Sequence, residues 1–347
     1  MNQLSTRLRQ AILSPSFRSQ KKSIFFHPSS ASVETESETG KEVIGSCHRE
    51  QYYRLTEEPT TNVGEPDYAI SAAIGDKVSE LIVQLIDTHG FKMGLQRLAV
   101  EHSFYDPRIN VSGRCDIIAW DFTTNEPVGI EVKSVGEYKA SKTMDAPSDE
   151  HIMQAVIYLD YYRTFIPAGQ IIPKKWYIWY CSRTENYSIK SKKHGSPFTM
   201  LWDYFITLED NGTPVIHSHA KSVRMPHLGV TKIHERYKRL EGYVAAKALP
   251  PRDYDLSYSP EKITTLYKSD KLTRKADKEV IEKWLNKGAP AGKLKIEMGD
   301  FECKMCPWQD KCWNKETQIE IQNTLSNLPK IEETTEEKPK YNLKTLW

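Results

Sequence analysis

The sequence predicts an α/β fold in which helices flank a central mixed sheet. Stretches with apolar residues at helical spacing alternate with short runs rich in β-branched and aromatic residues. Two of those runs follow each other across a short polar turn, which is typical of a β-hairpin. The chain has 347 residues, 39% of them hydrophobic and 27% charged, so it is long enough for one large domain or two small ones.

The first predicted elements are a helix and a hairpin. Residues 69–90 carry an apolar stripe at helical spacing, and Gly90 is expected to close this helix. Residues 111–122 and 127–134 are two β-rich runs, and the turn TTNE between them predicts that they pair.

A second helix and a further strand follow the hairpin. Residues 148–165 are predicted to be helical, with Ser148 as the N-cap and with Asp149 and Glu150 in the first turn, where the helix dipole favours acidic side chains. Residues 174–182 carry the aromatic and β-branched composition of a strand.

Composition divides the chain into three parts. Residues 1–42 are predicted to form a basic N-terminal helix and a flexible Ser-rich linker; because the first 33 residues contain five Arg or Lys and no acid, a transit peptide is the alternative. Residues 43–314 contain no long low-complexity break and are expected to form one domain. Residues 315–347 are expected to be a charged, flexible tail. Its last segment, YNLKTLW, could dock on a partner protein or on the parent domain.

The sequence predicts an intracellular protein without a membrane partner. No apolar run approaches the roughly 18 residues that a membrane span needs, and no secretory hydrophobic core stands near the start. We expect the cytoplasm, or the host cytoplasm for a phage protein, with the mitochondrion as the alternative. The net charge of +2 neither requires nor excludes a nucleic-acid partner.

Three cysteines, Cys303, Cys306 and Cys312, lie close together in the segment FECKMCPWQDKCW. Six cysteines in a reducing compartment argue for metal or redox use before disulfides. Three thiols are one too few for a site with four thiolates, so a fourth is expected elsewhere. Cys115 and Cys181 lie in strand patterns and are predicted to be small buried hydrophobes.

The predicted hairpin carries the chemistry. Side chains alternate along a strand, so Glu131 and Lys133 project to one face, and Asp116 reaches the same face from the preceding strand. Two ionised carboxylates repel each other unless a cation lies between them, and hard oxygen ligands suit Mg²⁺ or Mn²⁺. A lysine beside such an ion can position water and offset phosphate charge. This pattern predicts phosphodiester hydrolysis; the alternative is an exposed hairpin with a surface ion pair.

The following helix adds two polar side chains. Gln154 and Tyr158 are four residues apart and share one helix face, so they could together hold a phosphate or a water. The alternative is a half-buried amide and phenol at the edge of the core.

These segments resemble a known family. "GRCDIIAWD", "GIEVKS" and "HIMQAVIY" occur in the order of motifs II and III and the Q-x-x-x-Y helix of the PD-(D/E)XK nuclease superfamily, in its RecB-like iron-sulfur branch. That branch includes CRISPR-adaptation nucleases, the AddB-type nuclease domain and the exonuclease V type. The resemblance covers roughly residues 43–314 and implies a restriction-endonuclease-like core in which Asp116 and Glu131 bind the metal ion.

The resemblance also supplies a fourth cysteine. Iron-sulfur members join one cysteine before the nuclease core to a C-x2-C-x5-C group after it, and "SCHREQYYRL" places Cys47 at the upstream position. The resemblance therefore implies that Cys47, Cys303, Cys306 and Cys312 hold a [4Fe-4S] cluster. Four thiolates could also hold zinc, which is the alternative. Either group would act as a staple that joins the N- and C-terminal parts of the domain.

One position departs from the family pattern. Many members carry a histidine ligand before a glutamate in the first helix, where this chain has Ser79 before Glu80. Either Glu80 supplies the ligand, or the site works with Asp116, Glu131 and the carbonyl oxygen of Val132, or the enzyme is weakened.

The resemblance implies DNA ends as the substrate, usually single-stranded. Four residues are candidate DNA contacts because basic and aromatic side chains grip single strands without sequence preference: Arg49, Lys139, Lys142 and His151. Lys139 and Lys142 lie in a stretch expected to be a loop. The prediction is a Mg²⁺- or Mn²⁺-dependent DNA exonuclease in repair, recombination or phage DNA metabolism. The alternatives are a non-catalytic DNA-end binding or recombination-partner protein and a zinc-stapled endonuclease.

Overall fold

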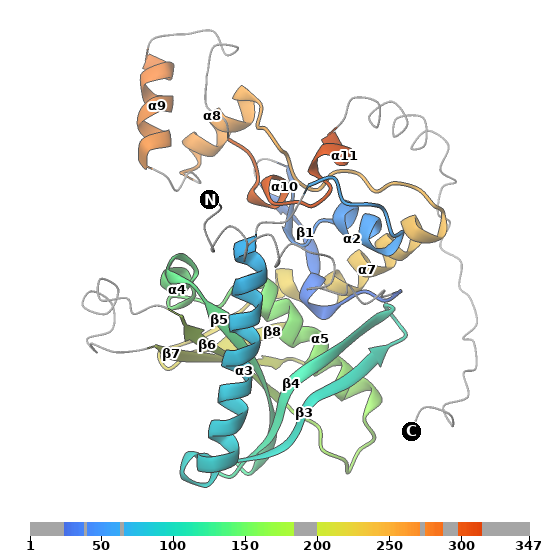
Figure 1. The fold of residues 1–347 in the computed structure, drawn as a ribbon, viewed down its shortest axis with the longest axis vertical. Coiled ribbons are helices and arrows are strands. Elements are labelled where there is room, and N and C mark those ends of the chain that lie inside the picture. The colour runs from blue at the N-terminus through green and yellow to red at the C-terminus, as the bar shows by residue number, and fades with distance from the viewer. Residues whose placement is uncertain are drawn as a thin grey trace, which may run out of the picture.

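A computed structural model of the chain describes residues 24–37, 40–62, 66–183, 200–270, 275–286 and 298–313. Its centre is a mixed seven-stranded sheet flanked by helices (Figure 1). The strands of this sheet are, in chain order, β3 (Leu95–Asp106), β4 (Val111–Asp121), β5 (Glu126–Val135), β6 (Lys175–Ser182), β7 (Leu201–Leu208), β8 (Pro214–His217) and β9 (Ser222–Arg224). They neighbour one another in that same order. The pair β5 and β6 runs parallel and the other neighbours run antiparallel. The predicted α/β class with a mixed sheet is therefore confirmed.

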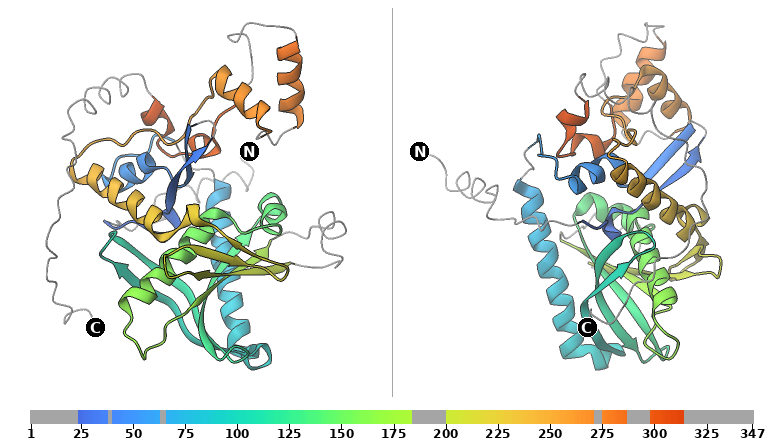
Figure 2. Two further views of the ribbon diagram at one scale, coloured as in Figure 1. Left: turned by 180° about the vertical axis from the view of Figure 1, so that it is seen from behind. Right: turned by 90° about the vertical axis from the view of Figure 1, so that its right-hand side faces the viewer.

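Helices lie on both faces of the sheet (Figure 2). On one face, Ile82 and Ile86 pack against Ile117, Ile130 and other apolar side chains of β4 and β5. On the other face, helix α5 (Asp149–Phe165) joins the main hydrophobic core. The helices are α2 (His48–Leu55), α3 (Pro66–Met93), α4 (Glu137–Thr143), α5 (Asp149–Phe165), α7 (Val230–Ala245), α8 (Pro260–Lys268), α9 (Lys275–Asn286), α10 (Phe301–Lys304) and α11 (Gln309–Trp313), with short 3-10 turns at Pro28–Ser30 and Pro226–Leu228. The long helix that carries Ile82 and Ile86 is α3, and its counterpart on the opposite face is α5.

The predicted hairpin and its flanking elements are present. Asp121 pairs with Glu126 across the turn between β4 and β5. Helix α5 begins after Ser148, although the Ser148 side chain makes no capping hydrogen bond. Strand β6 follows at Lys175–Ser182. Residues 137–143, expected to be a loop, form α4 instead.

The first long helix does not end at Gly90. It continues to Met93, and Gly94 then adopts a φ of +72° that favours glycine. A Cβ atom on Gly90 would lie 2.4 Å from the carbonyl oxygen of Leu95. The role of Gly90 is therefore to let the next strand approach the helix closely. From the sequence alone, a glycine in this role looks the same as a glycine that ends a helix.

The predicted flexible linker is also wrong in part. Residues in the second half of the expected 1–42 segment form β1 (Ser32–Ser37), which pairs antiparallel with β2 (Gly40–Gly45). Val33 is fully buried, and Glu34 forms an ion pair with Arg239 of α7 at 2.9 Å. The Ser-rich composition suggested a linker because the apolar residue that anchors this strand stands alone among polar neighbours. Residues 1–23, the predicted basic helix, and the tail 315–347 lie outside the described residues.

Two segments far apart in the sequence lie side by side. The carbonyl oxygen of Pro307 accepts the amides of Thr61 and Asn62, both at 2.9 Å, and the indole of Trp308 donates to the carbonyl oxygen of Glu58. Residues 298–313 thus dock on the region around α2 (Figure 1). Among the described helices, none is long and apolar enough to cross a membrane.

Candidate active site and cysteine pocket

Strands β4 and β5 separate at the candidate active site. Their paired register runs from Asp121 and Glu126 to Ile117 and Ile130 and stops there. Beyond this point, which we call the fork, the carboxylate of Asp116 accepts the backbone N–H of Val132 at 2.8 Å. The side chain therefore replaces the strand as the partner of that amide. Continuing the register would place Asp116 opposite Glu131.

Two of the predicted residues bond directly to Glu131. Its Oε1 atom accepts hydrogen bonds from Nζ of Lys133 at 2.7 Å and from Nε2 of Gln154 at 2.8 Å. Lys133 also donates to Oε1 of Gln154 at 2.8 Å. Nε2 of Gln154 donates in addition to the hydroxyl of Tyr158, which donates to the carbonyl oxygen of Arg114. The structure therefore brings Glu131, Lys133, Gln154 and Tyr158 into one hydrogen-bonded network.

The two carboxylates carry a charge that the protein compensates only in part. Burial foremost, and the nearby charge of Glu131, raise the pKa of Asp116 to about 7. Glu131 is 4% exposed, and its Oε2 atom has no hydrogen-bond partner among the described residues. A buried carboxylate oxygen without a partner is costly unless a cation or proton meets it. Two such hard oxygen donors fit Mg²⁺ or Mn²⁺.

No described hydrogen bond or ion pair joins Glu80 to this group. Its side chain is 57% exposed and forms an ion pair with Lys77 on the same helix at 2.6 Å. It is also absent from the charged groups that shift the pKa of Asp116, whereas Glu101 of β3 is among them. Sequence analysis missed Glu101 because its position depends on the register of a third strand.

The candidate DNA contacts differ in their availability. Lys139 and Lys142 are exposed on α4; Lys139 lies 3.5 Å from Glu150, and Lys142 lies over the ring of Tyr138. His151 is half-buried, and its Nδ1 atom is 2.8 Å from the hydroxyl of Tyr180. Burial, together with the charges of Lys133 and Lys139, holds the pKa of His151 well below its usual range. His151 can therefore offer a hydrogen bond but not a positive charge.

The prediction for Arg49 is wrong. Its side chain is 2% exposed, and Nε and Nη2 both donate to the carbonyl oxygen of Pro250. Nη1 lies 3.4 Å from the sulfur of Cys312. The guanidinium therefore faces the cysteine pocket and is closed off from DNA. Its place in a helix beside polar residues suggested an exposed side chain, but the docking of residues 298–313 covers it.

The four predicted cysteine ligands line one pocket. Cys47 stands at the start of α2, and Cys303, Cys306 and Cys312 come from the segment that docks on it. Burial raises the pKa of Cys47 to about 12 and that of Cys306 to about 11. Such thiols stay protonated unless a cation compensates the thiolate charge. Four thiols that line one pocket are donors of the type that a four-thiolate metal group needs.

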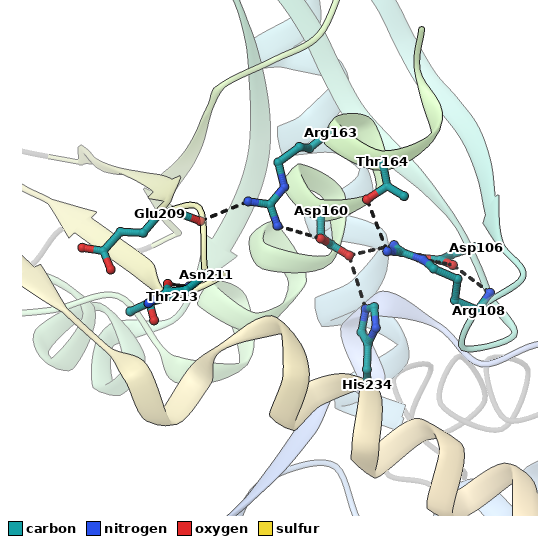
Figure 3. Close-up of polar contacts among 9 residues, drawn as sticks. All are labelled: Asp106, Arg108, Asp160, Arg163, Thr164, Glu209, Asn211, Thr213 and His234. Atoms are coloured by element: carbon teal, nitrogen blue, oxygen red, sulfur yellow. Dashed lines mark hydrogen bonds and ion pairs between the residues drawn. The ribbon is translucent and has the colours of Figure 1, made fainter. Parts of the chain in front are cut away.

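A separate cluster of charged residues lies on the outer side of α5 (Figure 3). Ligand atoms of Asp106, Asp160 and His234 lie within 4.8 Å of one another. Arg108 already donates to both carboxylates, at 2.6 Å and 2.7 Å. Although burial alone would raise it, hydrogen bonding to His234 and the charge of Arg108 lower the pKa of Asp160 to about 2. We interpret this group as an ion-pair cluster that joins the β3–β4 hairpin, α5 and α7.

The two candidate sites meet through α5. A Cβ atom on Gly45 would lie 2.9 Å from the terminal methyl of Met153, the residue before Gln154. Gly45 is two residues before Cys47 in the sequence. The strand that leads to the cysteine pocket therefore rests on the helix that carries Gln154. No protein-family model and no curated protein matches this chain, so the side chains themselves must indicate its function.

Proposed function

We propose that this chain is a Mg²⁺- or Mn²⁺-dependent nuclease of the PD-(D/E)XK type that hydrolyses DNA, with single-stranded ends as its substrate. The observation that carries this proposal is Glu131. It is almost fully buried beside Asp116, one of its oxygens lacks a partner, and the other accepts from Lys133 and Gln154. This arrangement supports a cation site with a lysine next to it.

Each side chain has a proposed role. Asp116, Glu131 and the carbonyl oxygen of Val132 would hold the metal ion. A bound ion of this kind lowers the pKa of a coordinated water and offsets phosphate charge. Lys133, whose side chain is 18% exposed, would orient the water or a phosphate oxygen from its position between Glu131 and Gln154. Tyr158 fixes Gln154 through a 2.7 Å hydrogen bond.

Helix α4 offers a surface for the DNA strand. Tyr138 is 71% exposed, with the ammonium of Lys142 4.5 Å from its ring centre. An exposed aromatic ring can stack on a base while lysines contact phosphates, which is a sequence-independent grip. The α4 helix directly follows β5, which carries Glu131 and Lys133. We therefore propose that Lys139 and Lys142 guide a single strand toward the fork, and that His151 donates or accepts a hydrogen bond there.

The decisive nuclease test compares wild type with Lys133→Ala on end-labelled single-stranded DNA, with Mg²⁺ or Mn²⁺. Lys77→Ala is the matched control, because Lys77 is a 75% exposed lysine on α3. We expect wild type and Lys77→Ala to shorten the DNA and Lys133→Ala to lose roughly 100-fold or more in rate. Wild type that binds DNA ends but leaves them intact would instead indicate a non-catalytic DNA-end binding protein.

We also propose that Cys47, Cys303, Cys306 and Cys312 hold a [4Fe-4S] cluster. Zinc at a Zn–S distance of about 2.3 Å needs sulfurs about 3.8 Å apart. No three cysteine sulfurs among the described residues lie within 4.8 Å of one another, and it is the resemblance to the iron-sulfur branch that favours iron over zinc. Anaerobic purification, a visible spectrum and metal analysis test this. Broad absorption near 400 nm with iron supports the cluster, and a colourless protein with one zinc would replace it with the zinc alternative.

A further inference from the structure

Three carboxylates occupy equivalent positions on three adjacent strands. Between β3 and β4, Val100 pairs with Ile117 and His102 with Cys115, so Glu101 stands opposite Asp116. Between β4 and β5, the same counting places Glu131 opposite Asp116 on its other side. Residues opposite each other on regular antiparallel strands have Cβ atoms roughly 5 Å apart. The positive φ of Glu101 and the end of the β4–β5 pairing at Ile117 make the backbone irregular on both sides of Asp116. By register, Asp116 is the middle of a row of acids that crosses the sheet at the fork.

We infer that Glu101 is the third carboxylate of the metal site, in the position that Glu80 was expected to fill. This inference rests on the proposed metal-dependent function. An acidic row alone would not indicate a ligand; the independent observation is the Oε2 atom of Glu131, which is buried in the same row without a partner. The row thus contains a buried oxygen whose charge a cation would compensate, and Glu101 is the carboxylate that follows Asp116 along it.

The surroundings of Glu101 leave it able to turn toward that cation. Its carboxylate now forms an ion pair with Arg114 at 2.9 Å, but the two side chains are 49% and 64% exposed. An exposed pair of this kind contributes roughly 0–1 kcal/mol, so exchanging it for a divalent ion costs little.

The backbone at Glu101 is unusual for a strand. Its φ is +51°, and the β3 register shifts by one residue shortly before it, between Arg97 and Ala99. This irregularity sets which β3 residue faces Asp116, because a shift of one residue would move a different side chain into the row. The bulge therefore places a carboxylate, rather than the neighbouring Val100 or His102, beside the fork.

The test measures Mn²⁺ affinity by isothermal titration calorimetry on metal-stripped protein, without DNA. We expect Glu101→Gln to weaken Mn²⁺ binding by about tenfold or more, a loss equivalent to about 1.4 kcal/mol. Glu80→Gln is the matched control, a similarly exposed glutamate, and should bind Mn²⁺ like wild type. Arg114→Gln removes the ion pair but keeps Glu101, and should not weaken binding. Thermal melting confirms that each variant is folded.

The outcomes separate this inference from the proposed function. Wild type that binds Mn²⁺ together with an unchanged Glu101→Gln variant overturns the role of Glu101 and leaves the nuclease proposal standing. A loss in Glu80→Gln instead would return the third ligand to α3 and also overturn it. A similar loss in Arg114→Gln would mean that the ion pair, not the carboxylate, matters. Wild type without Mn²⁺ affinity would overturn both proposals.

Discussion

At the scale of single residues, the candidate site is characterised by two buried carboxylates with few positively charged neighbours. Asp116 and Glu131 are held close together in a buried position, and Lys133 is the one positively charged side chain among the described residues that bonds to this pair. The residue types and their alternation along two strands were enough to predict that Asp116, Glu131 and Lys133 face one another. Sequence could not identify Glu101, because its place depends on a bulge in β3, nor the burial of Arg49, which depends on a segment docked from far along the chain.

The free energy of unfolding should depend on pH because the ionised Asp116 carboxylate is costly to bury. The pKa of this carboxyl rises from 3.8 to about 7 on folding, so its contribution to stability is fully present below pH 4 and is lost as the pH rises through 7. In metal-free protein at pH 8, Asp116→Asn should therefore be more stable than wild type by on the order of 1–3 kcal/mol. Urea unfolding in EDTA at pH 5 and pH 8 measures this. Equal stabilities of the two proteins at pH 8 would contradict it.

Tyr158 should matter more for the position of Gln154 than for the chemistry. Tyr158→Phe removes the acceptor for Nε2 of Gln154 and the donor to the carbonyl oxygen of Arg114, both in a buried region. We expect a loss of about 1–3 kcal/mol in the free energy of unfolding and a partial loss of nuclease rate. Urea unfolding and the DNA assay measure the two effects. Tyr161→Phe, three residues further along α5, is the control, since this tyrosine is only partly buried.

At the scale of elements, the parallel pairing with β6 sets the position of β5, the strand that carries Glu131 and Lys133. A Cβ atom on Gly129 would lie 2.3 Å from the indole of Trp176, so the two strands approach at a glycine. The order of hairpin, helix and strand could be predicted from periodicity and turn residues. The β1–β2 pair could not, because its strands bury few side chains of their own and are held by contacts with α7.

Two glycine substitutions should have opposite effects. Gly129→Ala forces a methyl group into Trp176 and should destabilise the protein by about 1–3 kcal/mol, with reduced activity because β5 carries Glu131. Gly242→Ala in α7 has no atom within 4 Å of the added Cβ and should stabilise by about 0.5–1 kcal/mol. Thermal melts of both variants decide this. If Gly129→Ala raised the melting temperature as Gly242→Ala is expected to do, the Trp176 contact would be unimportant.

At the scale of the whole molecule, the cysteine pocket connects the start and the end of the described domain. Residues 58–62 bond to residues 307 and 308, and Tyr254 donates to the carbonyl oxygen of Gly45. Gly45 rests against Met153 of α5. The cysteine spacing, with the family resemblance, indicated which segments should meet. It did not indicate that this contact would bear on the helix of Gln154.

Loss of one of the pocket cysteines should loosen this connection while the sheet remains folded. In Cys303→Ser we expect faster amide hydrogen exchange in residues 47–62 and 298–313 and a smaller change of the exchange rate in β4 to β6. Because the strand that leads to the pocket rests on α5, we also expect a partial loss of nuclease rate. Cys181→Ser is the control, because this half-buried cysteine lies outside the pocket. Uniform loss of protection across the sheet would show instead that the pocket is needed for the whole fold.

The docking of residues 298–313 on α2 also orders events during synthesis. Cys47 leaves the ribosome early, whereas Cys303, Cys306 and Cys312 follow it after roughly 10–50 s at about 5–20 residues per second. The seven strands and α5 are all made in that interval. The pocket can therefore be complete only after these strands and α5 have been synthesised, and a metal group bound by all four cysteines would be enclosed at that late step.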